Sequence, residues 1–359
     1  MKNLCWFFLM VCIAISCTSN QETELDIRNN DRYHINVYTT PVYLTLDNDT
    51  NSFDSSEIKC LGSGILSRSF AIKAANLSYK FGLTHGDTIG IFPENDYQIP
   101  FALPIPVGPP VTSSTMLAEG WSTKSSVLYA VYLPWKFENR YYNHIPWDNR
   151  TIQKQKGNDN TDSISNYWLL ASDTLHSGDG YFGARLINMG TMVRCQVKSP
   201  CAGTFSRMII ATDSKIIPTH GYYDLFDVSA PKEDIETSPG VFAQITSCPY
   251  LHQPLHPEGY TDHITLDMEN VSVAGSNVNI RGWFLFPECD LSGKNLTVYL
   301  YDNLGNCYTS STSFANKPLT RSGCVALGFS NLVLTTTPFT NLNPWETDDL
   351  CQGCSPVAF

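Results

Sequence analysis

Short runs in which apolar and polar residues alternate, each closed by turn residues, are the feature that most restricts how this chain can fold. Ile35 and Val37 alternate with their neighbours, and residues 42–47 (VYLTLD) repeat the alternation after Pro41. Strict alternation puts every second side chain on one face of a strand, which suits a half-buried sheet. No long stretch repeats apolar residues at helical spacing. We therefore expect an all-β protein.

Two further segments predict particular kinds of strand. Residues 127–133 (VLYAVYL) are apolar on both faces and are followed by Pro134, which is typical of a central strand covered on both sides. Residues 296–301 alternate again, and the turn residues 302–306 (DNLGN) separate them from Tyr308. This order predicts a β-hairpin near the end of the chain.

Long loops are expected between the strands. Residues 100–110 (PFALPIPVGPP) are stiffened by proline, and residues 153–166 are mostly polar. Many short strands with such punctuation indicate β-sandwiches rather than a helical or α/β enzyme. A division near residues 180–190 would give two domains of similar size.

The first residues predict export. Residues 4–15 (LCWFFLMVCIAI) form an apolar core of signal-peptide length after Lys2, too short to span a bilayer as a helix. Residues 13–17 (IAISC) resemble the bacterial lipobox, in which the cysteine becomes the lipid-bearing N-terminus. Cys17 is therefore the predicted lipidation site, and an ordinary signal peptide with a chance cysteine is the alternative. A polar tether would follow at residues 18–31.

Charge and cysteine content add two limits. The net charge of −11 argues against a nucleic-acid partner, because phosphates attract basic surfaces. Of the 12 cysteines, those beyond Cys17 are odd in number, so they cannot all pair within the chain. An exported protein can form disulfides, but several of these positions are equally well interpreted as small buried apolar side chains.

Enzymatic and metal-binding signatures are weak. Gly62-Ser63-Gly64 lacks the strand-to-helix context of a nucleophile elbow and is better interpreted as a flexible turn. His252 and His256 have metal-ligand spacing, but the prolines between and beside them forbid a regular helix. His263 beside an aspartate indicates a generic surface pair. We predict no catalytic residue, no metal and no cofactor.

Two remaining features keep alternatives open. Cys351 and Cys354 have redox or half-zinc-site spacing, but a structural disulfide or a pairing with another cysteine suits them better. The tryptophans, Trp121 and Trp147 among them, could form a glycan-binding platform, whereas strands and sandwich cores are also rich in aromatics.

The order of several segments resembles the fimbrillins, or type V pilins, which are fimbrial subunits exported as lipoproteins. Residues 86–92 (GDTIGIF) resemble the family's "GDxIGVF" strand, and residues 128–135 (LYAVYLPW) its "FYAYYPY" strand. Residues 167–171 (YWLLA) are similar to "DLLYA". Residues 296–309, with the later Trp345, are similar to the terminal hairpin and closing tryptophan of the family.

Some residues depart from the family pattern. Asn188 and Gly190 stand where an aromatic residue and a histidine are usual. The cysteine content and the tail after Trp345 are also unusual for the family. These departures argue against a standard stalk role.

The resemblance implies two transthyretin-like β-sandwich domains in tandem and a non-enzymatic role. The implied division is a signal peptide at 1–17, a tether with a leading strand at 18–68, and domains at 69–185 and 186–359. A trypsin-like protease would cut after Arg68 and leave Ser69 as the new N-terminus. A strand from another fimbrial subunit would then fill the open groove. The alternative for Arg68 is an ordinary surface arginine.

The resemblance also implies partners and a location. The chain would be a cell-surface lipoprotein of the outer membrane, held by its lipid, with a host or bacterial receptor. The bacteria that carry fimbrillins often O-glycosylate exported proteins at short motifs of Asp, then Ser or Thr, then an aliphatic residue. Residues 162–164 fit this motif, and Ser163 is the best-placed acceptor. Stalk, anchor and tip roles all stay open, and a surface glycan-binding lipoprotein is the competing function.

Overall fold

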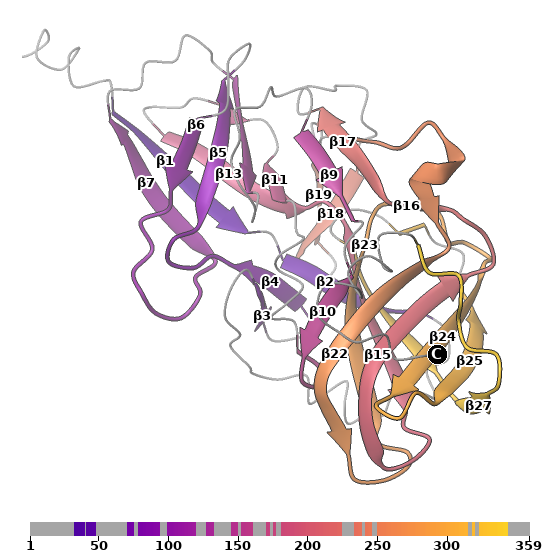
Figure 1. Cartoon of the computed structure of the whole chain (residues 1–359). Coiled ribbons are helices and arrows are strands. Elements are labelled where there is room, and N and C mark those ends of the chain that lie inside the picture. The colour runs from indigo at the N-terminus through magenta and orange to yellow at the C-terminus, as the bar shows by residue number, and fades with distance from the viewer. Residues whose placement is uncertain are drawn as a thin grey trace, which may run out of the picture.

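The structure is a computed structural model of the chain (Figure 1). The residues it describes are 32–39, 41–47, 70–74, 78–93, 99–119, 127–132, 145–149, 152–160, 170–172, 175–176, 181–224, 233–238, 241–245, 250–314, 318–319 and 323–343.

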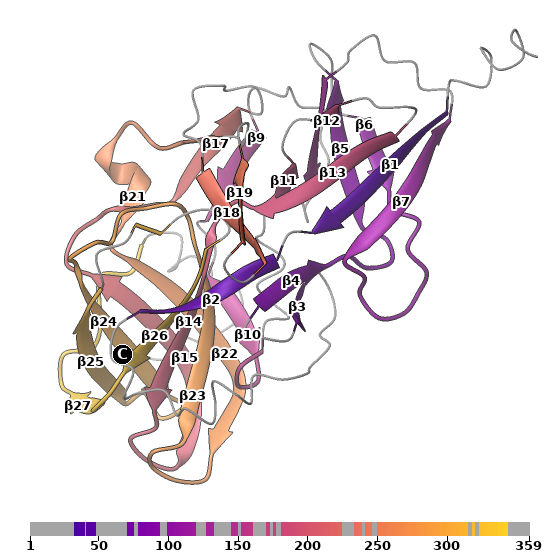
Figure 2. The ribbon, with the colours of Figure 1, turned by 180° about the vertical axis from the view of Figure 1, so that it is seen from behind.

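These residues form an all-β protein. Strands make up the regular structure of the described ranges, apart from a 3-10 turn, η3 (Pro257–Gly259). The expectation of an all-β fold is confirmed. Figures 1 and 2 show one large sheet at one end of the molecule and two six-stranded sheets toward the other.

The eight-stranded sheet has the order β6-β5-β8-β11-β13-β1-β7, with β12 pairing to β8. Its strands are β1 (Arg32–Thr39), β5 (Thr88–Pro93), β6 (Ile99–Ala102), β7 (Ser113–Glu119), β8 (Val127–Tyr132), β11 (Leu170–Ser172), β12 (Leu175–His176) and β13 (Tyr181–Asn188). The apolar run predicted as a central strand is β8, which lies between β5 and β11. Its inner position in the sheet is confirmed.

The β15 sheet, the first of the two six-stranded sheets, has the order β10-β22-β15-β24-β25-β27. Its strands are β10 (Gln153–Lys156), β15 (Gly203–Thr212), β22 (His263–Val273), β24 (Asn295–Asp302), β25 (Cys307–Ser313) and β27 (Val333–Thr335). β24 and β25 form the predicted hairpin, and Gly305 in its turn has a φ of +85°, a left-handed value that favours glycine.

The β14 sheet, the second of them, has the order β23-β14-β26-β2-β4-β3. Its strands are β2 (Pro41–Asp47), β3 (Phe70–Ala74), β4 (Ser78–Gly82), β14 (Thr191–Lys198), β23 (Asn279–Phe286) and β26 (Gly323–Phe329). β14 pairs in parallel with β26 and antiparallel with β23.

The main core lies between the β15 and β14 sheets. Val193 and Phe284 of the β14 sheet belong to the same buried cluster as Phe205, Leu266 and Val298 of the β15 sheet. Side chains from the facing sides of both sheets supply this cluster, as a two-sheet sandwich requires. The cluster also includes two cysteines, which therefore act here as small apolar side chains.

Three small sheets complete the described strands. They are the pair β16 (Ile217–Pro218) with β21 (Tyr260–Thr261), the set β20 (Tyr250–His252), β17 (His220–Asp224) and β9 (Ile145–Asp148), and the hairpin of β18 (Glu233–Ser238) with β19 (Val241–Ile245).

The polar stretch predicted as a loop from residue 153 begins instead with a strand. β10 pairs in parallel with β22, from Gln153 opposite Leu266 to Lys156 opposite Glu269. The expectation was wrong for these residues because the buried side chains of β10 are glutamines, so no apolar alternation marks the strand. The loop expected at 100–110 is found from Leu103 onward, after β6.

Candidate functional site

The leading segment of the chain supplies an inner strand to two different sheets. β1 lies between β13, to which it runs parallel, and β7, to which it runs antiparallel. Val37, near its C-terminal end, is fully buried. The apolar alternation predicted here thus coincides with a strand that is hydrogen-bonded on both sides.

β2 continues this arrangement in the β14 sheet. It pairs in parallel with β26, Leu44 lying opposite Cys324 and Leu46 opposite Ala326, and antiparallel with β4. Both β26 partners are buried. Figures 1 and 2 show β1 and β2 following each other from the large sheet toward the sandwich.

This arrangement has a clear chemical consequence. An inner strand satisfies backbone N–H and C=O groups on two neighbours at once, and its loss would leave both neighbours as open edges. An extended peptide can satisfy such edges by β-augmentation, with pockets for alternate side chains. β1 and β2 are therefore the candidate functional site.

The predicted modification sites fall outside the described residues. Cys17, Arg68, Ser69 and Ser163 all lie there, as does Trp121. In the sequence, Arg68 stands between the end of β2 and the start of β3. Trp147, the other tryptophan proposed for glycan binding, is in β9, and its side chain is not among those described.

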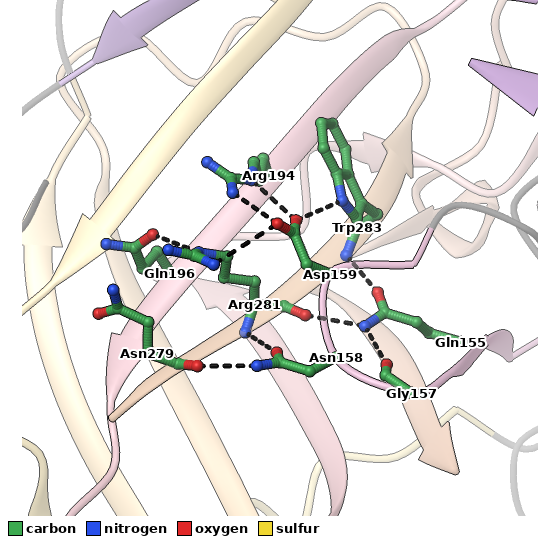
Figure 3. Close-up of polar contacts among 9 residues, drawn as sticks. All are labelled: Gln155, Gly157, Asn158, Asp159, Arg194, Gln196, Asn279, Arg281 and Trp283. Carbon is green, nitrogen blue, oxygen red and sulfur yellow. Dashed lines mark hydrogen bonds and ion pairs between the residues drawn. The ribbon is translucent and has the colours of Figure 1, made fainter. Parts of the chain in front are cut away.

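A largely buried polar network around Asp159 was not foreseen from the sequence (Figure 3). The Asp159 carboxylate accepts hydrogen bonds from Arg194 Nε at 3.0 Å, Arg194 Nη2 at 2.7 Å and Trp283 Nε1 at 3.0 Å. Arg194 is 2% exposed, and its guanidinium lies 5.7 Å from the centre of the Trp283 ring. Nη1 of a second arginine, Arg281, lies 3.6 Å from Asp159 Oδ2.

Trp283 is a buried member of this network. This residue is 2% exposed and its indole N–H is bonded within the protein, so it cannot serve as a sugar platform. The signal in the sequence was the pair Gln153 and Gln155, which alternate like strand residues although they are polar. Asp159 follows them with a φ of +59°, and its carboxylate lies against the β14 sheet.

Several cysteines are buried thiols in the structure. Burial raises the pKa of Cys195, Cys289 and Cys324, which keeps these thiols protonated and unreactive. Burial also raises the pKa of Cys307. The interpretation of several cysteines as small buried side chains is confirmed at these four positions.

The prediction of a surface pair at Asp262 and His263 is wrong for the histidine. His263 is 2% exposed, and its Nδ1 lies 2.7 Å from Asp262 Oδ1. Residues 336–343, which we call the C-terminal strap, lie against the β15 sheet and help to bury this histidine. Phe339 of the strap packs against the imidazole with ring centres 4.7 Å apart.

The strap also covers an apolar patch. Tyr301 Oη accepts a hydrogen bond from Phe339 N at 2.9 Å, and Leu342 packs against the same small cluster, which includes Ile209. A pocket of about 220 Å³ remains beside the strap. It is lined by Arg207, Ile209, Tyr301, Pro338, Phe339, Thr340 and Leu342.

The described ranges hold neither a metal cluster nor a membrane-spanning helix. They contain no group of three or more His, Cys, Asp or Glu side chains arranged to hold a metal ion. His256 is exposed and stands just before η3. Among the same residues there is no helix long and apolar enough to cross a membrane.

No protein-family model and no curated protein sequence matches the chain. Solved structures do match, each at low identity. One is a candidate cell adhesion protein from Bacteroides ovatus, with a TM-score of 0.40, 11% identity, and coverage of 84% of this chain and 95% of that one. Another, from Bacteroides uniformis, has a TM-score of 0.42, 12% identity, and coverage of 71% and 91%.

A third match is the tip fimbrial protein Mfa3 from Porphyromonas gingivalis. Its TM-score is 0.36 at 8% identity, with 85% of this chain and 98% of that chain covered. The chain is thus similar, at low identity, to solved structures described as cell adhesion and fimbrial proteins.

Proposed function

We propose that this protein is a non-enzymatic structural subunit of cell-surface fimbriae, which joins other subunits by β-strand addition. The observation that supports this most is the position of β1 and β2. β1 fills an inner position in the eight-stranded sheet, and β2, which follows it in the sequence, fills an inner position in the β14 sheet. Both strands precede Arg68, so one cut there would release both from covalent connection to the rest.

The proposal includes the chain's processing. Lipid on Cys17 would hold the precursor to the outer membrane, and cleavage between Arg68 and Ser69 would free the leading strands. Ser163 is the proposed glycosylation site.

The proposed domains are two transthyretin-like sandwiches, at 69–185 and 186–359. Three strands complicate that division. β13 spans residue 185, while β2 and β10 pair with strands that follow it. The C-terminal sandwich would therefore be completed by segments from earlier in the chain.

The first experiment measures the N-terminus of the protein taken from the cell surface by mass spectrometry. A lipidated Cys17 identifies an uncut, membrane-held subunit, and a free Ser69 identifies a processed one. An Arg68→Ala variant is the matched control, because a trypsin-like protease cannot cut there. Any other N-terminus within the folded strands would contradict the proposed processing.

The second experiment tests strand addition itself. Residues 65–68 are replaced by a site for a specific protease, the purified chain is cut, and a peptide of residues 32–47 is added in excess. We expect the peptide to displace the leading strands, and the emptied chain to bind it and to form multimers. A scrambled peptide is the control. An emptied chain that stays folded but takes up neither peptide nor partner would refute the proposal.

A further inference from the structure

Among the described residues, side chains rather than another strand close the outer edge of β23. β23 is the last strand of the β14 sheet and pairs with β14 on one side. On its other side, Gln153 Nε2 donates to the Leu285 carbonyl at 2.8 Å, and the Leu285 N–H donates to Gln153 Oε1 at 2.8 Å. One amide side chain thus occupies both backbone groups of one residue.

The same kind of exchange repeats along the edge. Gln155 Nε2 donates to the Arg281 carbonyl at 2.8 Å, and its Oε1 accepts from the Trp283 N–H at 2.8 Å. Asn158 Nδ2 donates to the Asn279 carbonyl at 2.8 Å, and its Oδ1 accepts from the Arg281 N–H at 2.8 Å (Figure 3). An added strand would bond to these same alternate residues of β23.

The segment that supplies the amides is itself fixed. Gln153 and Gln155 are each 1% exposed, while the lysines that alternate with them are exposed. The backbone of the segment pairs with β22 of the opposite sheet, and Gly157 N donates to the Glu269 carbonyl at 2.6 Å. Beyond it, Asp159 is held by a buried arginine.

We propose that residues 152–160 are an edge guard, which keeps β23 from pairing with the β23 edge of a second copy of this chain. A second copy is the fitting partner because an antiparallel twofold pair presents the same donors and acceptors in reverse order. Open strand edges are the usual route to such pairing, and native proteins cover them. This inference does not depend on strand addition at β1 and β2, since β2 lies three places from β23 in the sheet.

The test uses the full chain with Gln153→Ala and Gln155→Ala together. Lys154→Ala with Lys156→Ala is the matched control, because it alters the same strand on its solvent side. Light scattering across a dilution series measures self-association, and hydrogen exchange follows the backbone amides of β23. We expect the glutamine variant to dimerise with a Kd at least about tenfold lower than that of wild type and of the lysine control.

Hydrogen exchange decides where any dimer forms. The proposal requires the Trp283 and Leu285 amides to exchange faster than in wild type when the variant is dilute, and to become protected as its concentration rises. Faster exchange without association would contradict the proposed role of residues 152–160. Association that leaves these amides unprotected would contradict it as well. If the double variant does not fold, Gln155→Glu answers the same question, because it keeps the side-chain length but, as a carboxylate, cannot donate to the Arg281 carbonyl.

Discussion

At the scale of the residue, the turn between β13 and β14 explains two departures from the fimbrillin pattern. A Cβ on Gly190 would lie 2.7 Å from the Phe286 carbonyl oxygen and 2.9 Å from Leu285 Cδ1, so a histidine cannot fit. Asn188 accepts a hydrogen bond from the Gly190 N–H at 3.2 Å. The small residue and the amide together make the close approach of this turn to β23 possible.

Gly190→Ala should therefore destabilise the fold by about 1–3 kcal/mol, the usual cost of forcing extra volume into a packed site. Gly203→Ala is the control, because its Cβ would meet nothing within 4 Å, and it should change stability by no more than about 0.5 kcal/mol. Urea unfolding of both variants measures the difference. Equal stabilities would show that the turn can shift to admit a methyl group.

Asp159 is the second residue whose loss should be costly. Asp159→Asn leaves the nearly buried Arg194 without its counter-charge, so we expect a loss of about 3 kcal/mol in the free energy of unfolding. Asp267→Asn removes an ion pair with Arg207 that is more exposed, and it should cost less than about 1 kcal/mol. Chemical denaturation measures both losses, and similar values would contradict a special role for the buried network.

At the scale of the element, the C-terminal strap depends on side-chain bonds to the β15 sheet. Tyr301→Phe removes the hydroxyl that accepts from Phe339 N and leaves the ring in place. We expect the Phe339 amide to exchange faster in the variant, with a loss of about 1 kcal/mol in stability. Tyr299→Phe, which keeps its own ring contact with Phe339 at 5.1 Å, is the control and should leave that amide unchanged.

Elements differed in how well the sequence predicted them. Alternating apolar residues marked β1, β2 and the β24–β25 hairpin, because alternation is the pattern of a strand with one face in an apolar core. β10 was missed because its buried face consists of glutamines whose partners lie more than a hundred residues away in the chain. His263 was misjudged for a related reason, since the strap that helps to cover it is remote in sequence.

At the scale of the whole molecule, the buried thiols make stability depend on pH. Burial raises the pKa of Cys195, Cys289 and Cys324, so these thiols stay protonated in the folded chain while those of the unfolded chain ionise near pH 9. The contribution of these thiols to the free energy of unfolding is complete below pH 9. It is lost as pH rises above 9, by up to about 1.4 kcal/mol per pH unit for each thiol.

Urea unfolding at several pH values between about 8 and 10 measures this dependence. A variant with all three cysteines changed to alanine should be less stable at the lowest pH, yet its stability should fall less steeply with pH than that of wild type. Equal slopes would mean that other groups set the pH dependence.

The candidate site formed by β1 and β2 was partly predictable at this scale. Alternation identified its two strands, because each repeats apolar residues with a period of two. The strands that lie beside them belong to segments far along the chain, such as β13 and β26. No local pattern records those contacts, so the inner position of β1 and β2 emerged only from the fold.

The pairing of β1 and β2 on both of their edges also has a mechanical consequence. Each strand has a neighbour on both sides and is joined to both by hydrogen bonds that run across its own length. A pull along β1 from its N-terminal end would load many of these bonds together, in shear, whereas a pull across the sheet would break them one after another. The leading segment is thus placed to bear tension along its axis and to yield to peeling.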